Sequence, residues 1–189
     1  MSFFDILITT AVVVAGVTIL LMVIGAVARK SMRDGAREWM RANGFTEHSI
    51  VFSPGDALGI DYGRSRIAVQ TSSQRKIIPF TDLISVEISE DGATVTKSNR
   101  GSQLAGAAIG AIAFGGIGAI VGGLSGSSTS TQKVSKITIN LMTKDTSLPF
   151  VEIVAFHEQA IDKGGFIYTQ LTKDIMPWYG RLRAVLEIS

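Results

Sequence analysis

A group of basic residues that could bind phosphate-bearing headgroups follows the apolar N-terminal stretch of the chain. Three of them lie directly behind residues 6–28, and three are spaced four residues apart, which places them on one helical face. The members of this group are Arg29, Lys30, Arg33, Arg37 and Arg41. A basic helix of this kind can lie on anionic lipid, so we predict headgroup contacts for these five residues.

An apolar stripe on the same segment leaves a second interpretation open. Met32, Ala36, Trp39 and Met40 share a helical face, and Gly44 is a suitable helix terminator. This stripe could pack against the domain that follows, with the arginines merely solvated. The segment at residues 29–44 is therefore predicted to be an amphipathic juxtamembrane helix that either lies on lipid headgroups or packs against the following domain.

No set of residues in the sequence predicts catalysis, a cofactor or a metal. The chain has no cysteine, and His48 and His157 have no partner at ligand spacing. Glu90 and Asp91 belong to an expected Asp-Gly turn rather than to an acid–base pair. The formal net charge is only +2 and the basic residues are not interleaved with aromatics, so nucleic-acid binding is not expected either.

The N-terminal segment predicts a membrane anchor at residues 1–28. Residues 6–28 carry no charge, and 23 residues at ~1.5 Å each exceed the ~30 Å hydrocarbon core. A cleaved signal peptide is the alternative, but no basic residue precedes the run and its apolar core is too long. Arg29, Lys30 and Arg33 follow the run. The positive-inside rule therefore predicts a protein of the cell (inner) membrane, with its N-terminus outside and the remainder of the chain in the cytoplasm.

Glycines at multiples of four residues mark an uncharged insertion at residues 101–132. A second row of small residues lies beside the first, so one side of a helix would have almost no side chains. Such small-xxx-small patterns let helix backbones approach closely, which predicts helix packing and a homo-oligomer. The residues assigned to this packing are Gly106, Gly110, Gly115, Gly118, Gly122 and Gly126. A phosphate-binding loop is not supported, because neither GxGxxG nor GK[ST] is present.

Three arrangements of this insertion are open. Two short helices turning near residues 114–116 would keep both flanks on one side of the membrane, and this helical hairpin is our preferred prediction. A single spanning helix over residues 104–124 would place the last strands outside. A soluble glycine-rich loop is the third.

The rest of the chain predicts a small β domain at residues 45–100 and 133–189. Strands are expected at 57–61, 66–70, 74–80, 84–88, 93–97, 134–143 and 149–156, from alternating apolar residues and from the turns between them. An amphipathic helix is expected at 166–186, with Ile167 on its buried face and with a kink or split at Pro177. The predicted fold is a membrane-anchored α+β protein: a small antiparallel barrel or sandwich capped by a C-terminal helix.

The order of these segments resembles a known family. "Lys-Ile-Ile-Pro-Phe-Thr-Asp-Leu-Ile-Ser-Val" at residues 76–86, then the glycine insertion, then "Ser-Lys-Ile-Thr-Ile-Asn-Leu" at 135–141, is similar to bacterial and phage membrane proteins that carry a pleckstrin-homology (PH)-like domain interrupted by a glycine zipper. The resemblance implies a seven-stranded β domain with a C-terminal capping helix. It also implies that basic residues in the first hairpin hold lipid headgroups, which corresponds here to Arg64 and Arg66, unless these form an ordinary charged turn.

Two functional predictions follow. The first is a non-enzymatic membrane-anchored protein that self-associates through its zipper and binds a protein partner or a lipid surface through its PH-like domain. The second is a membrane-active effector that forms a pore or perturbs the bilayer, in phage exclusion or bacterial competition.

Overall fold

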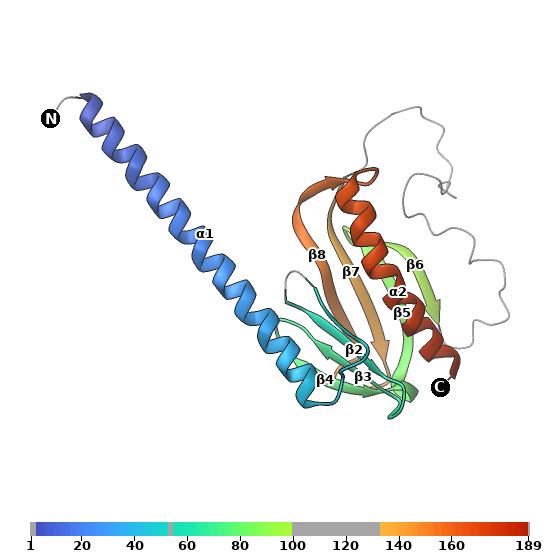
Figure 1. Ribbon diagram of the computed structural model, residues 1–189. Coiled ribbons are helices and arrows are strands. Elements are labelled where there is room, and N and C mark those ends of the chain that lie inside the picture. The colour runs from blue at the N-terminus through green and yellow to red at the C-terminus, as the bar shows by residue number, and fades with distance from the viewer. Residues whose placement is uncertain (1–2, 53–54, 100–132, 189) are drawn as a thin grey trace, which may run out of the picture.

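A computed structural model describes residues 3–52, 55–99 and 133–188 of the chain. In this part, helix α1 (Phe3–Ala42) leads into eight strands, and helix α2 (Phe166–Ile188) ends the domain (Figure 1). The predicted zipper insertion lies outside the described residues, and so do Gly106, Gly110, Gly115, Gly118, Gly122 and Gly126. The zipper hairpin therefore stays a prediction.

The described strands form two antiparallel four-stranded sheets. Sheet A has the order β1-β2-β3-β4, and sheet B has the order β6-β5-β7-β8. The strands of sheet A are β1 (Ser49–Val51), β2 (Ala57–Asp61), β3 (Arg66–Gln70) and β4 (Arg75–Pro79). Those of sheet B are β5 (Leu83–Glu90), β6 (Ala93–Asn99), β7 (Lys133–Thr143) and β8 (Phe150–Asp162). A 3₁₀ turn at Phe80–Asp82 joins the sheets.

The main core lies between the sheets and α2. Alternate residues of the central strands point inward, such as Leu58 and Ile60 on β2 or Ile137 and Ile139 on β7, and all four are buried. Helix α2 adds Trp178, Leu182 and other buried side chains to the same cluster. Each sheet thus buries one apolar face against the other, as the alternation in the sequence predicts.

The structure differs from the predicted fold in several details. Strand β1 was not recognised, since three residues are too few to show an alternating pattern. Helix α2 is continuous through Pro177, so of the two expected effects of this proline, a kink or a split, the split does not occur. Ile167 is 56% exposed, and its neighbour Tyr168 is buried in its place.

Strands β6 and β7 run in the same direction because both are antiparallel to β5, which lies between them. Asn99, at the end of β6, pairs with Ser85 near the start of β5. Lys133 begins β7 beyond Ile137, the partner of Glu90 at the end of β5. The insertion therefore connects opposite ends of sheet B.

Candidate functional site: the junction of α1 with sheet A

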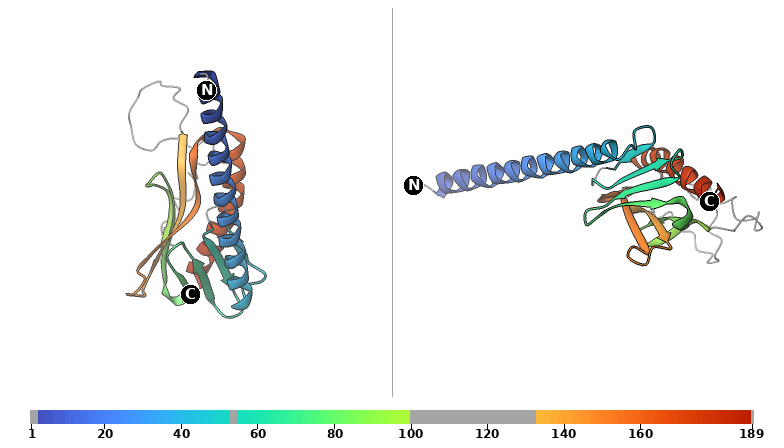
Figure 2. Two further views of the ribbon diagram at one scale, coloured as in Figure 1. Left: turned by 90° about the vertical axis from the view of Figure 1, so that its left-hand side faces the viewer. Right: turned by 90° about the horizontal axis from the view of Figure 1, so that it is seen from below.

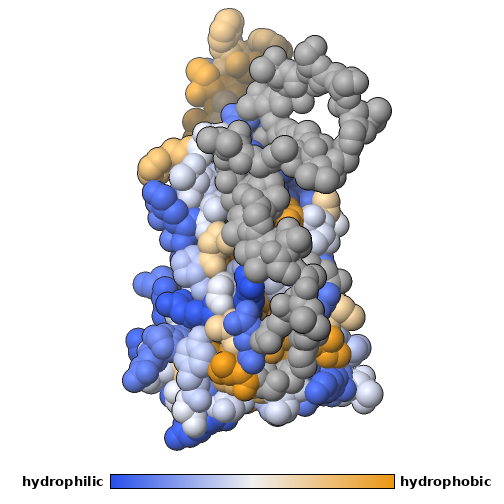
Figure 3. Space-filling view, turned by 90° about the vertical axis from the view of Figure 1, so that its right-hand side faces the viewer, coloured by the Kyte–Doolittle hydropathy of each residue, from blue (hydrophilic) through white to orange (hydrophobic). Residues whose placement is uncertain are grey.

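The N-terminal part of α1 is exposed along its length in the described part of the structure. Its large apolar side chains between Phe3 and Val27 are all more than half exposed. It projects away from the domain in Figure 2, and its end is orange where it rises above the mostly blue and pale domain surface in Figure 3. Thr9, Thr10 and Thr18 hydrogen-bond to backbone carbonyls one turn earlier, as expected for a helix in an apolar medium. Within the described residues this is the one helix long and apolar enough to cross a membrane.

The C-terminal turn of α1 ends in a regular helix cap. The amide of Gly44 donates to the carbonyl of Arg41 over 3.0 Å, and that of Phe45 donates to Met40 over 2.9 Å. This double pattern needs a left-handed residue, and Gly44 supplies it with φ of 84°. The cap turns the chain so that Phe45 folds back under the helix.

Small residues on the outer face of sheet A let α1 lie close to it. Ala57 and Ala68 are fully buried there, and they form a second apolar cluster with Ala36, Met40 and Phe45. A Cβ on Gly59, between them, would lie 3.0 Å from Cδ1 of Phe45 and 3.1 Å from the sulfur of Met40. The packing interpretation of the stripe is thus correct for Ala36 and Met40, whereas Met32 is 56% exposed.

Arg66 fastens the end of α1 to the sheet. Its Nη2 donates to the carbonyl oxygen of Asn43 over 2.7 Å, and its Nε donates to Oδ2 of Asp61 over 3.0 Å. Its guanidinium also lies 4.8 Å from the ring centre of Phe45. Burial raises the pKa of Asp61, but hydrogen bonds and charge from Arg66 and Arg64 outweigh it, and the net pKa is lowered.

The opposite end of the junction is polar and hollow. A cavity of about 430 Å³ lies between α1 and the β3–β4 turn. The residues that line it come from three places: Ser31, Met32 and Gly35 on α1, Gly55 and Asp56 before β2, and residues 70–75 of the β3–β4 hairpin. The junction therefore has a polar latch at Arg66, an apolar centre and a polar cavity near the start of the basic segment.

The structure separates the seven basic residues predicted to bind headgroups. Arg29, Lys30 and Arg41 are exposed on α1, Arg33 is half-buried, and Arg37 pairs with Asp34 over 3.0 Å. Arg64 is 67% exposed and lies 3.6 Å from Asp61. Arg66 is 22% exposed and bonded within the chain, so the structure gives it a positioning role. Headgroup binding by any of the seven stays a prediction.

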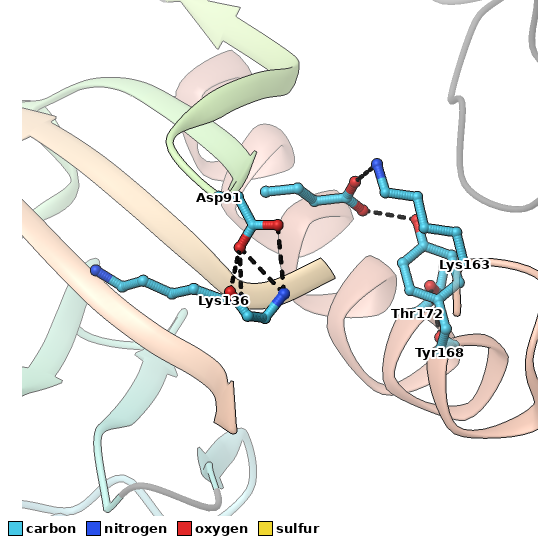
Figure 4. A network of polar contacts seen from close by, with 7 residues as sticks. Asp91, Lys136, Lys163, Tyr168 and Thr172 are labelled. Carbon is cyan, nitrogen blue, oxygen red and sulfur yellow. Dashed lines mark hydrogen bonds and ion pairs between the residues drawn. The ribbon is translucent and has the colours of Figure 1, made fainter. Parts of the chain in front are cut away.

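Polar contacts occur on the two strands that flank the zipper insertion. Before it, the hydroxyl groups of Ser98 and Tyr179 lie 2.7 Å apart. After it, the carboxylate of Asp91 accepts bonds from Ser135 Oγ over 2.8 Å and from the amide of Lys136 over 2.9 Å (Figure 4). Burial raises the pKa of Asp91, but these hydrogen bonds outweigh it and the net pKa is lowered.

A buried carboxylate, that of Glu90, lies next to Asp91 in the sequence. Glu90 is 4% exposed, and its two oxygens contact the hydroxyl of Tyr168 at 2.6 Å and Nζ of Lys163 at 2.5 Å (Figure 4). Burial, followed by the contact with Glu90, raises the pKa of Tyr168 well above its usual range. This network joins the end of β5 to the start of α2.

Neither histidine belongs to a reactive cluster. The ring of His48 packs edge-on against Tyr62, with 5.6 Å between ring centres, and His157 is exposed on β8. No group of three potential metal ligands occurs within residues 3–52, 55–99 and 133–188.

Sequence reasoning found the helix side of the junction, at Ala36 and Met40, but not the face of sheet A that receives it. It assigned Arg66 to lipid and gave no role to the cavity. The available signal was the row of small residues at positions 57, 59 and 68, which alternate with large apolar ones on two adjacent strands.

The chain is similar in sequence to two phage-derived proteins. The chain is 27% identical over 118 residues to the immunity protein of Bacillus phage SPbeta, covering 58% of this chain and 57% of that protein. It is also 27% identical over 118 residues to the SPbeta prophage-derived membrane protein YomJ of Bacillus subtilis strain 168, covering 58% and 50%. The chain thus spans about half the length of these relatives. No solved structure matches.

The apolar helix α1 and the membrane-protein relative indicate a membrane-associated protein. The family model of the glycine-zipper-containing PH domain matches residues 46–157, which include seven of the described strands in full and most of β8. This confirms the resemblance seen in the sequence, and the chain belongs to the family of PH domains that contain a glycine zipper.

Proposed function

We propose that this protein is a non-enzymatic assembly protein anchored in the cell membrane. Helix α1 crosses the bilayer, the zipper insertion drives self-association, and the cytoplasmic PH domain binds a protein partner or the lipid surface. The observation that carries the proposal is the continuity of α1 from its exposed apolar part into the docked part at Ala36 and Met40.

This continuity sets the distance between membrane and domain. The apolar run ends at Ala28, and Ser31 already lines the cavity against sheet A. Three residues of helix correspond to about 4.5 Å. A domain attached this closely lies against the membrane surface, where both lipid and other membrane proteins are within its reach.

Topology is tested with single cysteines, because the chain has none of its own. We would place them at Ser2, Ser128 and Glu158 and label intact cells with a membrane-impermeant maleimide. Labelling at Ser2 alone is expected for an outer N-terminus and a cytoplasmic domain. Labelling at Glu158 but not at Ser2 would reverse the orientation, and recovery of the protein in the soluble fraction would reject the anchor.

Self-association is tested by enlarging the zipper glycines. Replacing Gly110, Gly118 and Gly122 together by Leu is expected to abolish oligomers that chemical crosslinking detects in membranes. Gly180→Leu serves as the control, since a Cβ at this exposed position of α2 would have no atom within 4 Å. Unchanged crosslinking in the triple variant would reject the zipper as the assembly device.

A bilayer-active effector is the second candidate. It is favoured by the relative named an immunity protein in a phage, which fits a role in phage exclusion. Expression should then depolarise cells, measured with a potential-sensitive dye, and the Gly→Leu triple variant should abolish the effect. Membranes that stay polarised at full expression would reject this alternative and leave the assembly function in place.

A further inference from the structure

The cavity at the α1–sheet A junction has an acceptor-rich floor. Gln70 is 6% exposed; its Nε2 donates to the carbonyl of Gly55 over 3.4 Å, while its buried Oε1 has no hydrogen-bond partner among the described residues. Asp56 beside it is 5% exposed and accepts from the amide of Val154 over 2.8 Å. Burial raises the pKa of Asp56. A buried acceptor without a donor is costly, so this floor favours a ligand that brings N–H groups.

The rim of the cavity is cationic and rich in hydroxyl groups. Arg75 is exposed, and its guanidinium lies 5.8 Å from the ring centre of Trp39. No ion pair to Arg75 occurs within the described part of the chain. Ser31, Ser72 and Ser73 line the same cavity. A guanidinium with neighbouring hydroxyl donors suits a phosphate group.

The position of the cavity limits which ligands can reach it. Ser31 lies one helical turn behind the apolar run of α1, and Arg29, Lys30 and Arg33 surround that turn. If α1 spans the bilayer, the cavity opens at the level of the phosphate groups. A volume of about 430 Å³ lies within the range of small-ligand sites.

We infer that this cavity binds the phosphoethanolamine headgroup of a membrane phospholipid, with its phosphate at Arg75 and its ammonium at Gln70 Oε1. An ammonium supplies three N–H donors to the acceptor floor. The trimethylammonium of phosphatidylcholine supplies none, and the glycerol of phosphatidylglycerol carries no positive charge to set against Asp56. The assignment rests on the proposed membrane anchoring, and it gives the PH domain a specific lipid at a site different from its first hairpin.

The test measures headgroup binding to the full chain in maltoside micelles. Dihexanoyl phosphatidylethanolamine, phosphatidylcholine and phosphatidylglycerol are titrated, and the emission of Trp39 reports on Arg75 in a Trp178→Phe background. Native mass spectrometry of the unsubstituted protein gives a second readout without the Trp178 change. The ethanolamine lipid should bind at least about tenfold more tightly than the other two, because hydrogen bonds to a charged group contribute that much.

Three variants locate the site. Arg75→Gln should weaken binding of the ethanolamine lipid by about tenfold, and Gln70→Met should remove the preference over phosphatidylcholine. Lys173→Gln is the control, since Lys173 is an exposed basic residue on α2 that does not line the cavity, and it should leave the preference unchanged. Circular dichroism checks that each variant is folded.

Equal binding of all three lipids, or a preference that survives both cavity variants, would overturn the inference. So would phosphatidylglycerol binding as tightly as the ethanolamine lipid. Membrane fractionation keeps the two proposals distinguishable: a membrane-bound protein without headgroup preference rejects only the headgroup site. A protein with the preference but soluble in cells rejects only the anchor.

Discussion

Arg66 and Asn43 join the last turn of α1 to sheet A through a hydrogen bond of 2.7 Å, although 23 residues separate them in the sequence. The acceptor is a carbonyl at the end of the helix, where no intrahelical donor remains, and the donor carries a positive charge that the helix dipole favours there. Asp61 holds the same guanidinium from the other side. The domain thereby fixes the direction in which the apolar part of α1 leaves it.

Arg66→Gln should loosen this connection. We expect a loss of about 2 kcal/mol in the free energy of unfolding, because two hydrogen bonds of a charged group disappear from a partly buried position. Amide hydrogen exchange at Gly44 and Phe45 should accelerate as well. Hydrogen-exchange mass spectrometry of the protein in micelles measures the exchange rate of peptic fragments that contain these residues, and the free energy of unfolding that follows from the slowest fragments.

Arg64→Gln is the matched comparison. Arg64 faces the same Asp61, but it is 67% exposed and 3.6 Å away, so its replacement should change stability by less than about 0.5 kcal/mol. If the two variants lose the same free energy of unfolding, the role assigned to Arg66 in connecting α1 to sheet A is wrong.

Gly59→Ala should disturb the apolar centre of the junction. The new methyl group would lie 3.0 Å from Phe45 and 3.1 Å from Met40, so one of these side chains must shift. We expect a destabilisation of about 1–3 kcal/mol in chemical unfolding, the usual cost of overpacking.

Gly180→Ala on α2 should stabilise the protein, in contrast to Gly59→Ala. A Cβ there meets no atom within 4 Å, and alanine is the better helix former, so a stabilisation of about 0.5–1 kcal/mol is expected. A stabilising Gly59→Ala would show that α1 does not lie against β2 as described.

Much of the β domain could be predicted because its strands alternate. Residues 57–61 and 66–70 match β2 and β3 in full, and the Asp-Gly turn after Glu90 joins β5 and β6. Strand β1 could not be found, since it depends on pairing with β2 rather than on its own sequence. The end of β8 was also missed, because its last residues, from His157 onward, are mostly exposed and follow no buried alternation.

The junction depends on contacts that a local pattern does not contain. Arg66 was identified as a basic residue in a turn, but its partner Asn43 lies far away in the sequence. The cavity needs α1, the loop before β2 and the β3–β4 turn together. The glycine zipper shows the reverse case, since its pattern is clear in the sequence while its residues lie outside the described structure.

Tyr168→Phe tests the network between β5 and α2. The substitution removes the donor at 2.6 Å from Oε1 of Glu90 and leaves Lys163 to neutralise the buried charge alone. We expect a loss of about 1–3 kcal/mol in urea unfolding, the cost of an unsatisfied buried acceptor. Tyr62→Phe, at a side chain that is 39% exposed, should change stability by less than about 0.5 kcal/mol, and an equal loss in both variants would contradict the role given to Tyr168.

Asp91 should make the anchoring of the zipper insertion sensitive to acid. Its hydrogen bonds with Ser135 and Lys136 lower its pKa below the ordinary 3.8, so the folded protein favours the carboxylate. The stabilisation is fully present above pH ~4, the pKa of the unfolded chain, and it is lost as the pH falls through the lower pKa of the folded state. Asp91→Asn keeps one acceptor oxygen and suits the left-handed backbone at φ of 48°.

Unfolding midpoints measured from pH 7 to pH 2.5 should therefore show two effects. The Asn variant is less stable than the wild type at pH 7, and the difference shrinks below pH 4, where the wild type loses its carboxylate. Asp61 and Asp145, whose pKa values are also lowered, supply the acid sensitivity that remains in the variant. A difference that stays constant across this range would mean that the carboxylate of Asp91 is not stabilised in the folded state, and that its contacts hold the insertion without depending on its charge.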